Sequence, residues 1–344
     1  MTSAPQPTRR HFLGSTALGL AATAGLAWTG AARAQVAGVA ASAAASFGPI
    51  RQVEAGLLDV GYAELGPANG PVVVLLHGWP YDIHSFVEVA PRLASAGYRV
   101  IVPHLRGHGS TRFLSTESFR NGQQAAVAQD IMALLDALKM PRALFAGFDW
   151  GARTAGIIAA LWPERCEALV SVSGYLIGSR EANKAPLPPA AELAWWYQYY
   201  FATERGRLGY EKNRDAFARL IWQTASPKWQ FDEATFARSA ASLANPDHVA
   251  IVIHNYRWRL GLAEGEARYD ALEQRLAAGP AITVPSIVLE GDANGAPHFD
   301  GDAAFRRKFT GKYQFRLIEG GIGHNLPQEA PAAFAQAVLD VARL

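Results

Sequence analysis

An acidic residue stands at the centre of the stretch Gly147-Phe148-Asp149-Trp150-Gly151. A short apolar run precedes it, and alanine, isoleucine and leucine at helical spacing follow as far as Leu161, so the pattern predicts a strand, a sharp turn and a helix. Glycines at 147 and 151 allow a turn tight enough to expose Asp149, the geometry of a nucleophile elbow. A carboxylate attacks acyl carbon poorly but is a competent nucleophile at a saturated, electrophilic carbon. The predicted substrates are epoxides or alkyl halides, although an acid at a helix N-terminus is also common for electrostatic reasons alone.

Such an attack would leave an ester on Asp149, which a base-activated water must then hydrolyse. The sequence offers His324, in the glycine-rich segment GGIGHN that follows the last predicted strand. An imidazole can take a proton from water near neutral pH. His324 is therefore the predicted general base.

Three motifs occur in order along the chain: HGWP at 77–80, GFDWG around Asp149 and GGIGHN around His324. In this order they resemble the α/β-hydrolase family over the whole chain after its N-terminal segment. The resemblance implies an α/β-hydrolase fold, with a mostly parallel sheet flanked by helices and an inserted helical cap. It also implies an oxyanion hole, in which the backbone N–H groups of Trp79 and Trp150 hold the negative oxygen of a tetrahedral intermediate.

The acid that supports the base departs from the family's pattern. Relatives commonly place it three residues after the glycine that ends the preceding strand, and that count from Gly291 reaches Asn294. An amide oxygen can accept the N–H of His324 and orient the ring, but it does not balance the charge of the imidazolium. Asp292 carries that charge and takes the role if the loop turns it inward, and Asp300 is a more remote choice.

Two aromatic segments, WYQYYF and NYR, resemble the cap segments that carry the oxirane-binding tyrosines of soluble epoxide hydrolases. The match selects Tyr197 and Tyr256, with Tyr199 and Tyr200 as alternatives if the register differs. Two phenols aimed at one point would bind the epoxide oxygen and donate a proton as the ring opens. The predicted function is therefore hydrolysis of epoxides to diols.

Haloalkane or haloacid dehalogenases, with the same nucleophile and base, are the main alternative. Haloalkane dehalogenases usually carry asparagine where Trp79 stands, although the indole N–H groups of Trp79 and Trp150 could cradle a halide. Fluoroacetate dehalogenases bind the substrate carboxylate with arginines that follow the nucleophile, and here only Arg153 remains. A non-catalytic small-molecule binding protein of the same fold is a third alternative, because Asn294 replaces the expected acid.

The strands and helices that must position these residues alternate along the chain. Buried runs predict strands at 71–76, 99–103, 143–147, 168–173, 284–291 and 313–318, after a hairpin at 51–64. Helical spacing predicts helices at 84–96, 122–138 and 330–343. We expect hydrolase core at 35–175 and 263–344, with a helical, aromatic-rich cap at 176–262.

The composition limits the classes of partner. The chain has 344 residues, half of them apolar, and a net charge of +2 without a basic run, so nucleic acid is not expected. The histidines show no metal-ligand spacing and no phosphate loop is present, so neither a metal nor a cofactor is expected. Five tryptophans suggest an aromatic pocket for a small apolar organic substrate: Trp195, Trp196, Trp222, Trp229 and Trp258. The one cysteine, Cys166, is expected to be a quiet, partly buried thiol in the segment that leaves a helix.

The N-terminal segment 1–34 has the features of an export signal. Arg9 and Arg10 are followed by a weakly apolar run and by a small-residue site at Ala32-Arg33-Ala34. The order resembles a twin-arginine (Tat) signal peptide. We expect a soluble periplasmic protein that begins near Gln35 and keeps no stable membrane anchor.

Overall fold

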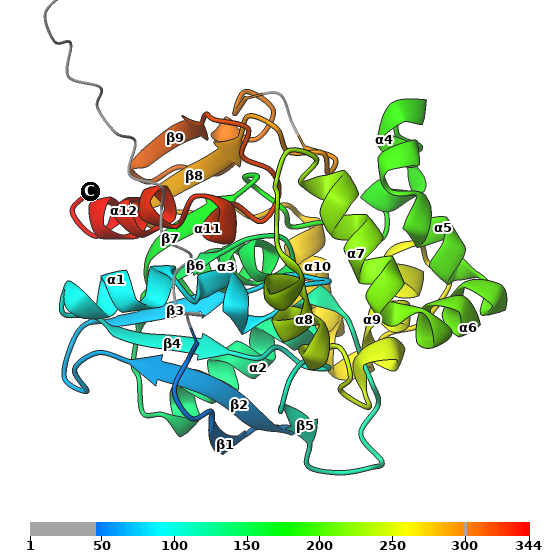
Figure 1. Ribbon diagram of the computed structural model, residues 1–344, viewed down its shortest axis with the longest axis horizontal. Coiled ribbons are helices and arrows are strands. Elements are labelled where there is room, and N and C mark those ends of the chain that lie inside the picture. The colour runs from blue at the N-terminus through cyan, green and yellow to red at the C-terminus, as the bar shows by residue number, and fades with distance from the viewer. Residues whose placement is uncertain (1–45, 299–300) are drawn as a thin grey trace, which may run out of the picture. The chain divides into compact units, whose positions relative to one another are not determined.

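A single sheet organises the chain. The computed structural model describes residues 46–298 and 301–344, and within these residues nine strands form one sheet (Figure 1). The strand order is β1-β2-β4-β3-β6-β7-β8-β9, with β5 paired to β2. The three pairs that involve β2 are antiparallel, and the pairs from β4 to β9 are parallel. The predicted fold class, a mostly parallel sheet flanked by helices, is confirmed.

The strands follow the apolar runs of the sequence. Along β3, Val73 and Leu75 pack into one hydrophobic cluster and Val74 and Leu76 into another, because successive side chains of a strand point to opposite faces. Both faces of the central strands are therefore buried, as continuous runs of β-branched residues require. The strands are β1 (Arg51–Ala55), β2 (Leu58–Leu65), β3 (Val72–Leu76), β4 (Arg99–Pro103), β5 (Arg112–Phe113), β6 (Ala143–Gly147), β7 (Cys166–Val172), β8 (Ser286–Gly291) and β9 (Tyr313–Ile318).

Helices cover the two faces of the sheet. Helices α2 (Gln124–Ala137) and α3 (Trp150–Leu161) pack together on one face, and α1 (Val89–Ser95) and α12 (Pro331–Val341) pack together on the other. Two further helices, α10 (Asp270–Ala277) and α11 (Leu326–Glu329), flank the last strands in sequence.

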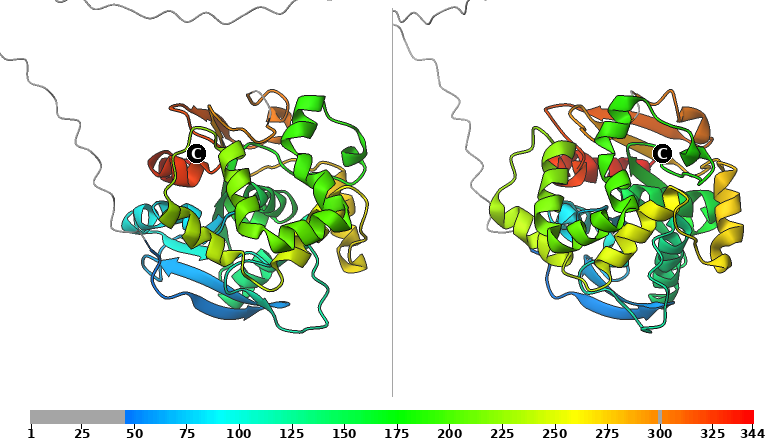
Figure 2. Two further views of the ribbon diagram at one scale, coloured as in Figure 1. Left: turned by 45° about the vertical axis from the view of Figure 1, so that its right-hand side comes forward. Right: turned by 90° about the vertical axis from the view of Figure 1, so that its right-hand side faces the viewer.

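Of the helices between β7 and β8, the first six α-helices, α4 to α9, are here called the cap helices. They gather at one end of the sheet (Figures 1 and 2). They are α4 (Pro189–Ala194), α5 (Trp196–Ala202), α6 (Glu204–Lys212), α7 (Arg214–Ala225), α8 (Glu233–Ser242) and α9 (His248–Arg259).

Two local expectations differ from the structure. The helix expected at 84–96 is a 3-10 turn at Ile83–Phe86 followed by α1. Pro91 explains the break, because a proline lacks the N–H that a continuous helix needs and is tolerated only in a first turn. Cys166 begins β7 and is 1% exposed, so it is more buried than expected.

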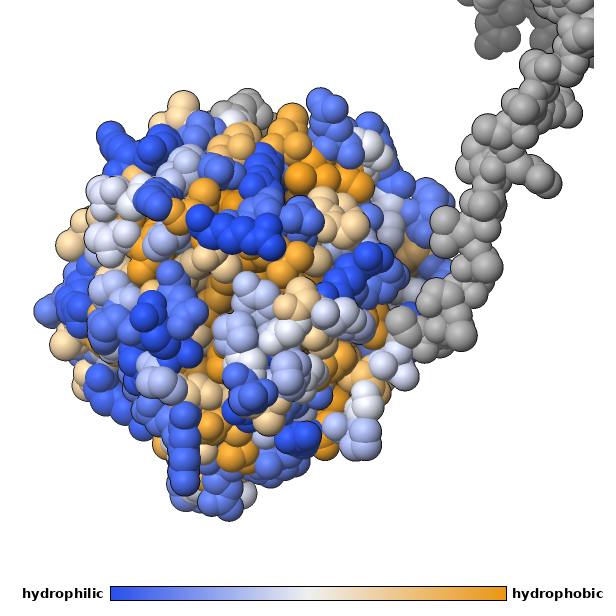
Figure 3. All heavy atoms as spheres, turned by 90° about the vertical axis from the view of Figure 1, so that its left-hand side faces the viewer, coloured by the Kyte–Doolittle hydropathy of each residue, from blue (hydrophilic) through white to orange (hydrophobic). Residues whose placement is uncertain are grey.

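The described surface is mixed in character. On the face in Figure 3, hydrophilic residues are interspersed with small hydrophobic areas. Among residues 46–298 and 301–344, no helix has the length and hydropathy needed to cross a bilayer. The predicted export signal at 1–34 lies outside the described residues.

Candidate active site

Asp149 occupies a strained turn between β6 and α3. Its φ of 53° and ψ of −124° are rare for a residue with a side chain. Glycine is needed at two neighbouring positions because of close approach: a Cβ at Gly151 would meet the carbonyl of Leu76, and a Cβ at Gly78 would meet the side chain of Asp149. The chain thus presents a carboxylate in the elbow geometry.

The two carboxylate oxygens of Asp149 have different surroundings. The backbone N–H of Trp79 donates to Oδ1 over 2.8 Å, and Nε2 of His324 lies 3.4 Å from Oδ2. Burial by itself raises the pKa of Asp149, but His324 and the backbone N–H groups of Trp79 and Trp150 together hold this pKa below its ordinary value. Asp149 is therefore ionised near neutral pH and keeps Oδ2 toward the histidine.

A chain of hydrogen bonds supports His324 from behind. Its Nδ1 lies 3.3 Å from Oδ1 of Asn294. The Asn294 amide in turn donates to Oε1 of Glu290, over 2.7 Å, and to Oγ of Ser173, over 3.3 Å. Glu290 is buried in β8 and was not selected from the sequence. A negative charge therefore lies one amide group behind the imidazole.

Asp292, the acid proposed from the sequence, does not contact His324. Its Oδ1 accepts the backbone N–H groups of Gly321 and Ile322, both over 2.8 Å, and its Oδ2 accepts that of Gly320 over 3.1 Å. These donors hold the carboxylate on the outer side of the glycine-rich loop. The expectation that Asp292 turns inward is wrong, because the loop's own backbone binds it.

The two predicted cap tyrosines meet above Asp149. The rings of Tyr197 and Tyr256 are 5.3 Å apart between centroids, and both side chains line the same cavity as Asp149. Burial, with the charge of Asp149 nearby, raises the pKa of each phenol above its usual value. Tyr199 is 48% exposed and Tyr200 stacks on Phe217, so the alternative register does not fit.

The indole of Trp79 is fixed to the cap helices. Its N–H donates to the hydroxyl of Tyr210 over 2.8 Å, and that hydroxyl lies 2.8 Å from Nε2 of His248. Nδ1 of His248 bonds to the carbonyl of Gly107, which leaves Nε2 as the acceptor for Tyr210. The indole N–H of Trp79 is therefore unavailable to a halide, whereas the buried indole N–H of Trp150 has no hydrogen-bond partner among the described residues.

The cavity over Asp149 has a volume of about 590 Å³. Trp79, Trp150, Trp195 and Trp196 line it together with the two tyrosines. The other tryptophans expected there lie elsewhere: Trp222 stacks on Trp229, 5.3 Å away between centroids, and Trp258 lines a separate hollow. Two arginines also line the cavity, Arg153 from α3 and Arg259 from α9.

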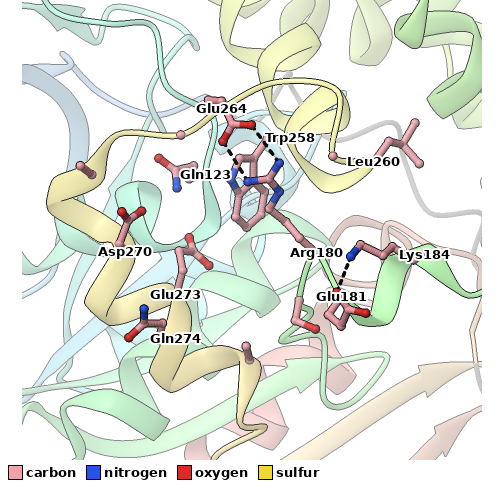
Figure 4. Close-up of a pocket in the computed structure, with 15 residues that line it drawn as sticks. Gln123, Arg180, Glu181, Lys184, Trp258, Leu260, Glu264, Asp270, Glu273 and Gln274 are labelled. Carbon is pink, nitrogen blue, oxygen red and sulfur yellow. Dashed lines mark hydrogen bonds and ion pairs between the residues drawn. The ribbon is translucent and has the colours of Figure 1, made fainter.

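The separate hollow, shown in Figure 4, is polar and its cations are paired. Arg180 lies 3.2 Å from Glu264, and Lys184 lies 2.5 Å from Glu181. It contains neither the elbow nor His324. Within the part of the chain that the structure describes, no group of three histidine, cysteine or acidic side chains could hold a metal.

A strained elbow after a central parallel strand, facing a histidine from a loop beyond the last strand, is the arrangement of the α/β hydrolases. A family profile described as alpha/beta hydrolase fold matches residues 71–225. Together with the relatives described next, this match shows that the chain belongs to this family as an epoxide-hydrolase-like member. The prediction of an enzyme of the hydrolase class is thereby confirmed.

Particular relatives are similar over different lengths. A Klebsiella pneumoniae protein provisionally named an epoxide hydrolase has a crystal structure with 62% identity and a TM-score of 0.85, covering 86% of this chain and 97% of that one. Epoxide hydrolase A of Mycobacterium tuberculosis is 27% identical over 305 residues, which is 80% of this chain and 92% of the relative. Epoxide hydrolase B of the same organism is 35% identical over 151 residues, and the match spans only 42% of that relative.

Proposed function

We propose that the protein hydrolyses epoxides to diols through a covalent ester on Asp149. The observation that carries this proposal is the meeting of an ionised Asp149 with two protonated phenols, Tyr197 and Tyr256, across one cavity. An epoxide needs both groups, since an alkoxide leaves poorly without a proton donor. The epoxide hydrolases among the relatives support the same substrate class.

In the first step, Oδ2 of Asp149 attacks a ring carbon, because Oδ1 already accepts the N–H of Trp79. The bond between that carbon and the ring oxygen breaks, and the oxygen takes a proton from Tyr197 or Tyr256. The products of this step are a hydroxyalkyl ester on Asp149 and a phenolate.

In the second step, Nε2 of His324 takes a proton from water, and the resulting hydroxide attacks Cγ of Asp149. The N–H groups of Trp79 and Trp150 stabilise the oxyanion that forms at Oδ1. The tetrahedral intermediate then breaks the bond between Cγ and Oδ2. The departing diol oxygen takes the proton of the new carboxyl group, and the imidazolium proton returns to the phenolate.

Asn294 and Glu290 have a supporting role in this scheme. Oδ1 of Asn294 accepts the Nδ1–H of His324, which leaves Nε2 free to act as base. Glu290 polarises the Asn294 amide and stabilises the imidazolium from a distance. This buried negative charge weakens the case for a non-catalytic binding protein, which rested on the missing acid.

A dehalogenase is the second candidate, and the unpartnered indole N–H of Trp150 favours it because it could donate to a leaving halide. The engagement of the Trp79 indole with Tyr210 disfavours it. Diol release from styrene oxide and halide release from a bromoalkane distinguish the two functions.

The test of the mechanism is the variant His324→Gln. Ring opening should proceed and hydrolysis should stall, so the tryptic peptide containing Asp149 should carry the mass of styrene oxide. The matched control is the double variant with Asp149→Asn, which should remain unmodified. An unmodified Asp149 in the single variant, with an epoxide that the wild type hydrolyses, would contradict the scheme.

We further propose that the hydrolase core comprises residues 35–175 and 263–344, with a cap inserted at 176–262. We also propose that residues 1–34 direct export by the twin-arginine pathway and that the mature protein is periplasmic. The order of paired arginines, apolar run and small-residue site supports the export proposal. Replacement of Arg9 and Arg10 by lysine should abolish export. N-terminal sequencing of the periplasmic protein should begin near Gln35, and retention of Thr2 would refute cleavage.

A further inference from the structure

Two arginines line the cavity without a carboxylate partner. Arg153 is 9% exposed, and its guanidinium donates a hydrogen bond to the amide oxygen of Asn255 over 3.1 Å. Arg259 lies over the rings of Trp195 and Tyr256, at 5.3 and 5.7 Å from their centroids. Neither arginine forms an ion pair with any of the residues that the structure describes.

Among the described residues, the other buried arginine is paired with a carboxylate. The fully buried Arg106 binds Asp130 through two hydrogen bonds of 2.6 and 2.7 Å. Arg180, at the polar hollow of Figure 4, is paired with Glu264. Because a buried cation without a counterion is costly, Arg153 requires a different explanation, and the half-buried Arg259 lines the same cavity.

The two cations also act on one another. Burial, and after it the charge of Arg259, lowers the pKa of Arg153 to about 10. Asp149 compensates part of this charge, but it would become a neutral ester during the proposed reaction. The cavity then holds the two cations without the charge of Asp149 while the substrate is covalently bound, and Glu273 is the carboxylate that still acts on Arg153.

Each arginine lies close to a reacting group. Arg153 follows Asp149 by four residues on α3, and Arg259 follows Tyr256 by three residues on α9. Residues at these spacings share one side of a helix. A group held by both arginines would therefore lie beside the carbon that Asp149 attacks.

We propose that Arg153 and Arg259 bind the carboxylate of the substrate, so that the substrate is a small epoxide bearing a carboxylate group. This inference rests on the proposed function and narrows its substrate class. Guanidinium groups suit the purpose because they stay charged and offer several N–H donors to a carboxylate. The aromatic part of the cavity then holds the remaining carbon chain.

The test compares glycidate with glycidamide, two epoxides of nearly equal size that differ in charge. For the wild type, kcat/KM should be at least about tenfold higher for glycidate. Arg259→Gln and Arg153→Gln should each lower this ratio about tenfold, and Arg259→Lys should restore part of it. The matched control is Arg180→Gln, outside the cavity, which should leave the ratio unchanged.

A ratio of one or below, with glycidamide or styrene oxide turned over, would overturn the carboxylate proposal and leave epoxide hydrolysis standing. A calorimetric binding measurement tests the anion site independently of turnover. Benzoate should bind the wild type at least about tenfold more tightly than benzamide, and Arg259→Gln should remove the difference. Preferential benzoate binding without turnover of any epoxide would support the anion site and refute the proposed function, whereas equal binding would count against the anion site.

Discussion

The imidazole of His324 reaches Asp149 across 175 residues of chain, yet its own support is local. Asn294 follows Glu290 by four residues, and the amide joins the glutamate to the ring. A carboxamide between acid and base keeps the orientation of the ring and moves the negative charge further away. The electrostatic help to the imidazolium should therefore be present but weaker than from a directly bonded carboxylate.

This arrangement predicts the effect of Glu290→Gln. The substituted amide can still accept the Asn294 N–H, so the fold and the ring opening should be retained, while hydrolysis of the Asp149 ester should slow by about tenfold, equivalent to about 1.4 kcal/mol in the barrier. Rapid-quench measurement of the ester and of the diol separates the two steps.

The control exchanges the acid and the amide between positions 290 and 294. Asn294→Asp alone places two carboxylates in contact and should be worse than Glu290→Gln alone. The double variant, with Asp at 294 and Gln at 290, should recover hydrolysis. No recovery would show that Glu290 serves only packing.

The phenols at 197 and 256 predict a pH profile. Their protonated forms are the active ones, and burial holds each pKa above the ordinary value of 10. The rate of ring opening should therefore not decline through tyrosine ionisation until the pH exceeds 10. Tyr256→Phe should lower kcat/KM by roughly tenfold to a hundredfold, since one phenol remains. A tyrosine-dependent decline near pH 8, absent from the phenylalanine variant, would contradict this account.

How far the sequence predicts this site depends on what each residue's neighbours reveal. Asp149 and His324 stand in glycine-rich turns after apolar strands, so their types and positions were readable. Glu290 sits inside a buried strand, where spacing gives it no special place; an acid within an apolar run was the available signal. The prediction for Asp292 failed because backbone N–H groups of the glycine-rich loop bind its carboxylate, and the sequence does not reveal this contact because it forms only in the folded loop.

At the scale of elements, the sequence predicted the bounds of several strands but did not predict which faces of the cap helices line the cavity. Strands β4, β6 and β9 have the bounds expected from their apolar runs. In the cap, aromatic residues occur on every side of the helices, so the sequence did not separate Trp196, in the cavity, from Trp222, in the core. Arg259 was detectable in principle, because it lies three residues after Tyr256 on α9.

The contact between Trp79, Tyr210 and His248 joins the HGWP turn to α6 and α9. Tyr210→Phe would leave the indole N–H and Nε2 of His248 buried without partners. The free energy of unfolding should fall by about 1–3 kcal/mol, as expected for lost buried hydrogen bonds. Urea denaturation measures this loss, with Tyr199→Phe, on the exposed side of α5, as the control that should change little.

At the scale of the molecule, the turns that follow the strands of the sheet form one side of the cavity, and the cap segment between β7 and β8 covers the other side. Alternating apolar runs with turn residues predicted this plan, because a strand-helix rhythm specifies a parallel sheet. Which side chains line the cavity depends on how the cap segment packs against the sheet domain, and local sequence patterns do not determine this packing.

Cys166 offers a probe of the whole fold. It is the one cysteine in the chain, it is 1% exposed, and burial raises the pKa of its thiol. A thiol-specific reagent should label the native protein only as fast as the sheet opens, and should label it at once in urea. Rapid labelling without denaturant would show that β7 opens locally.

Trp79 has a consequence for anyone who redesigns this enzyme. Its backbone N–H donates a hydrogen bond to Asp149, and its indole N–H donates one to Tyr210 of the cap helices. Changing how α6 or α9 packs, in order to admit bulkier substrates, would thus also disturb the reaction centre, so Tyr210 and His248 should be kept if turnover is to be retained.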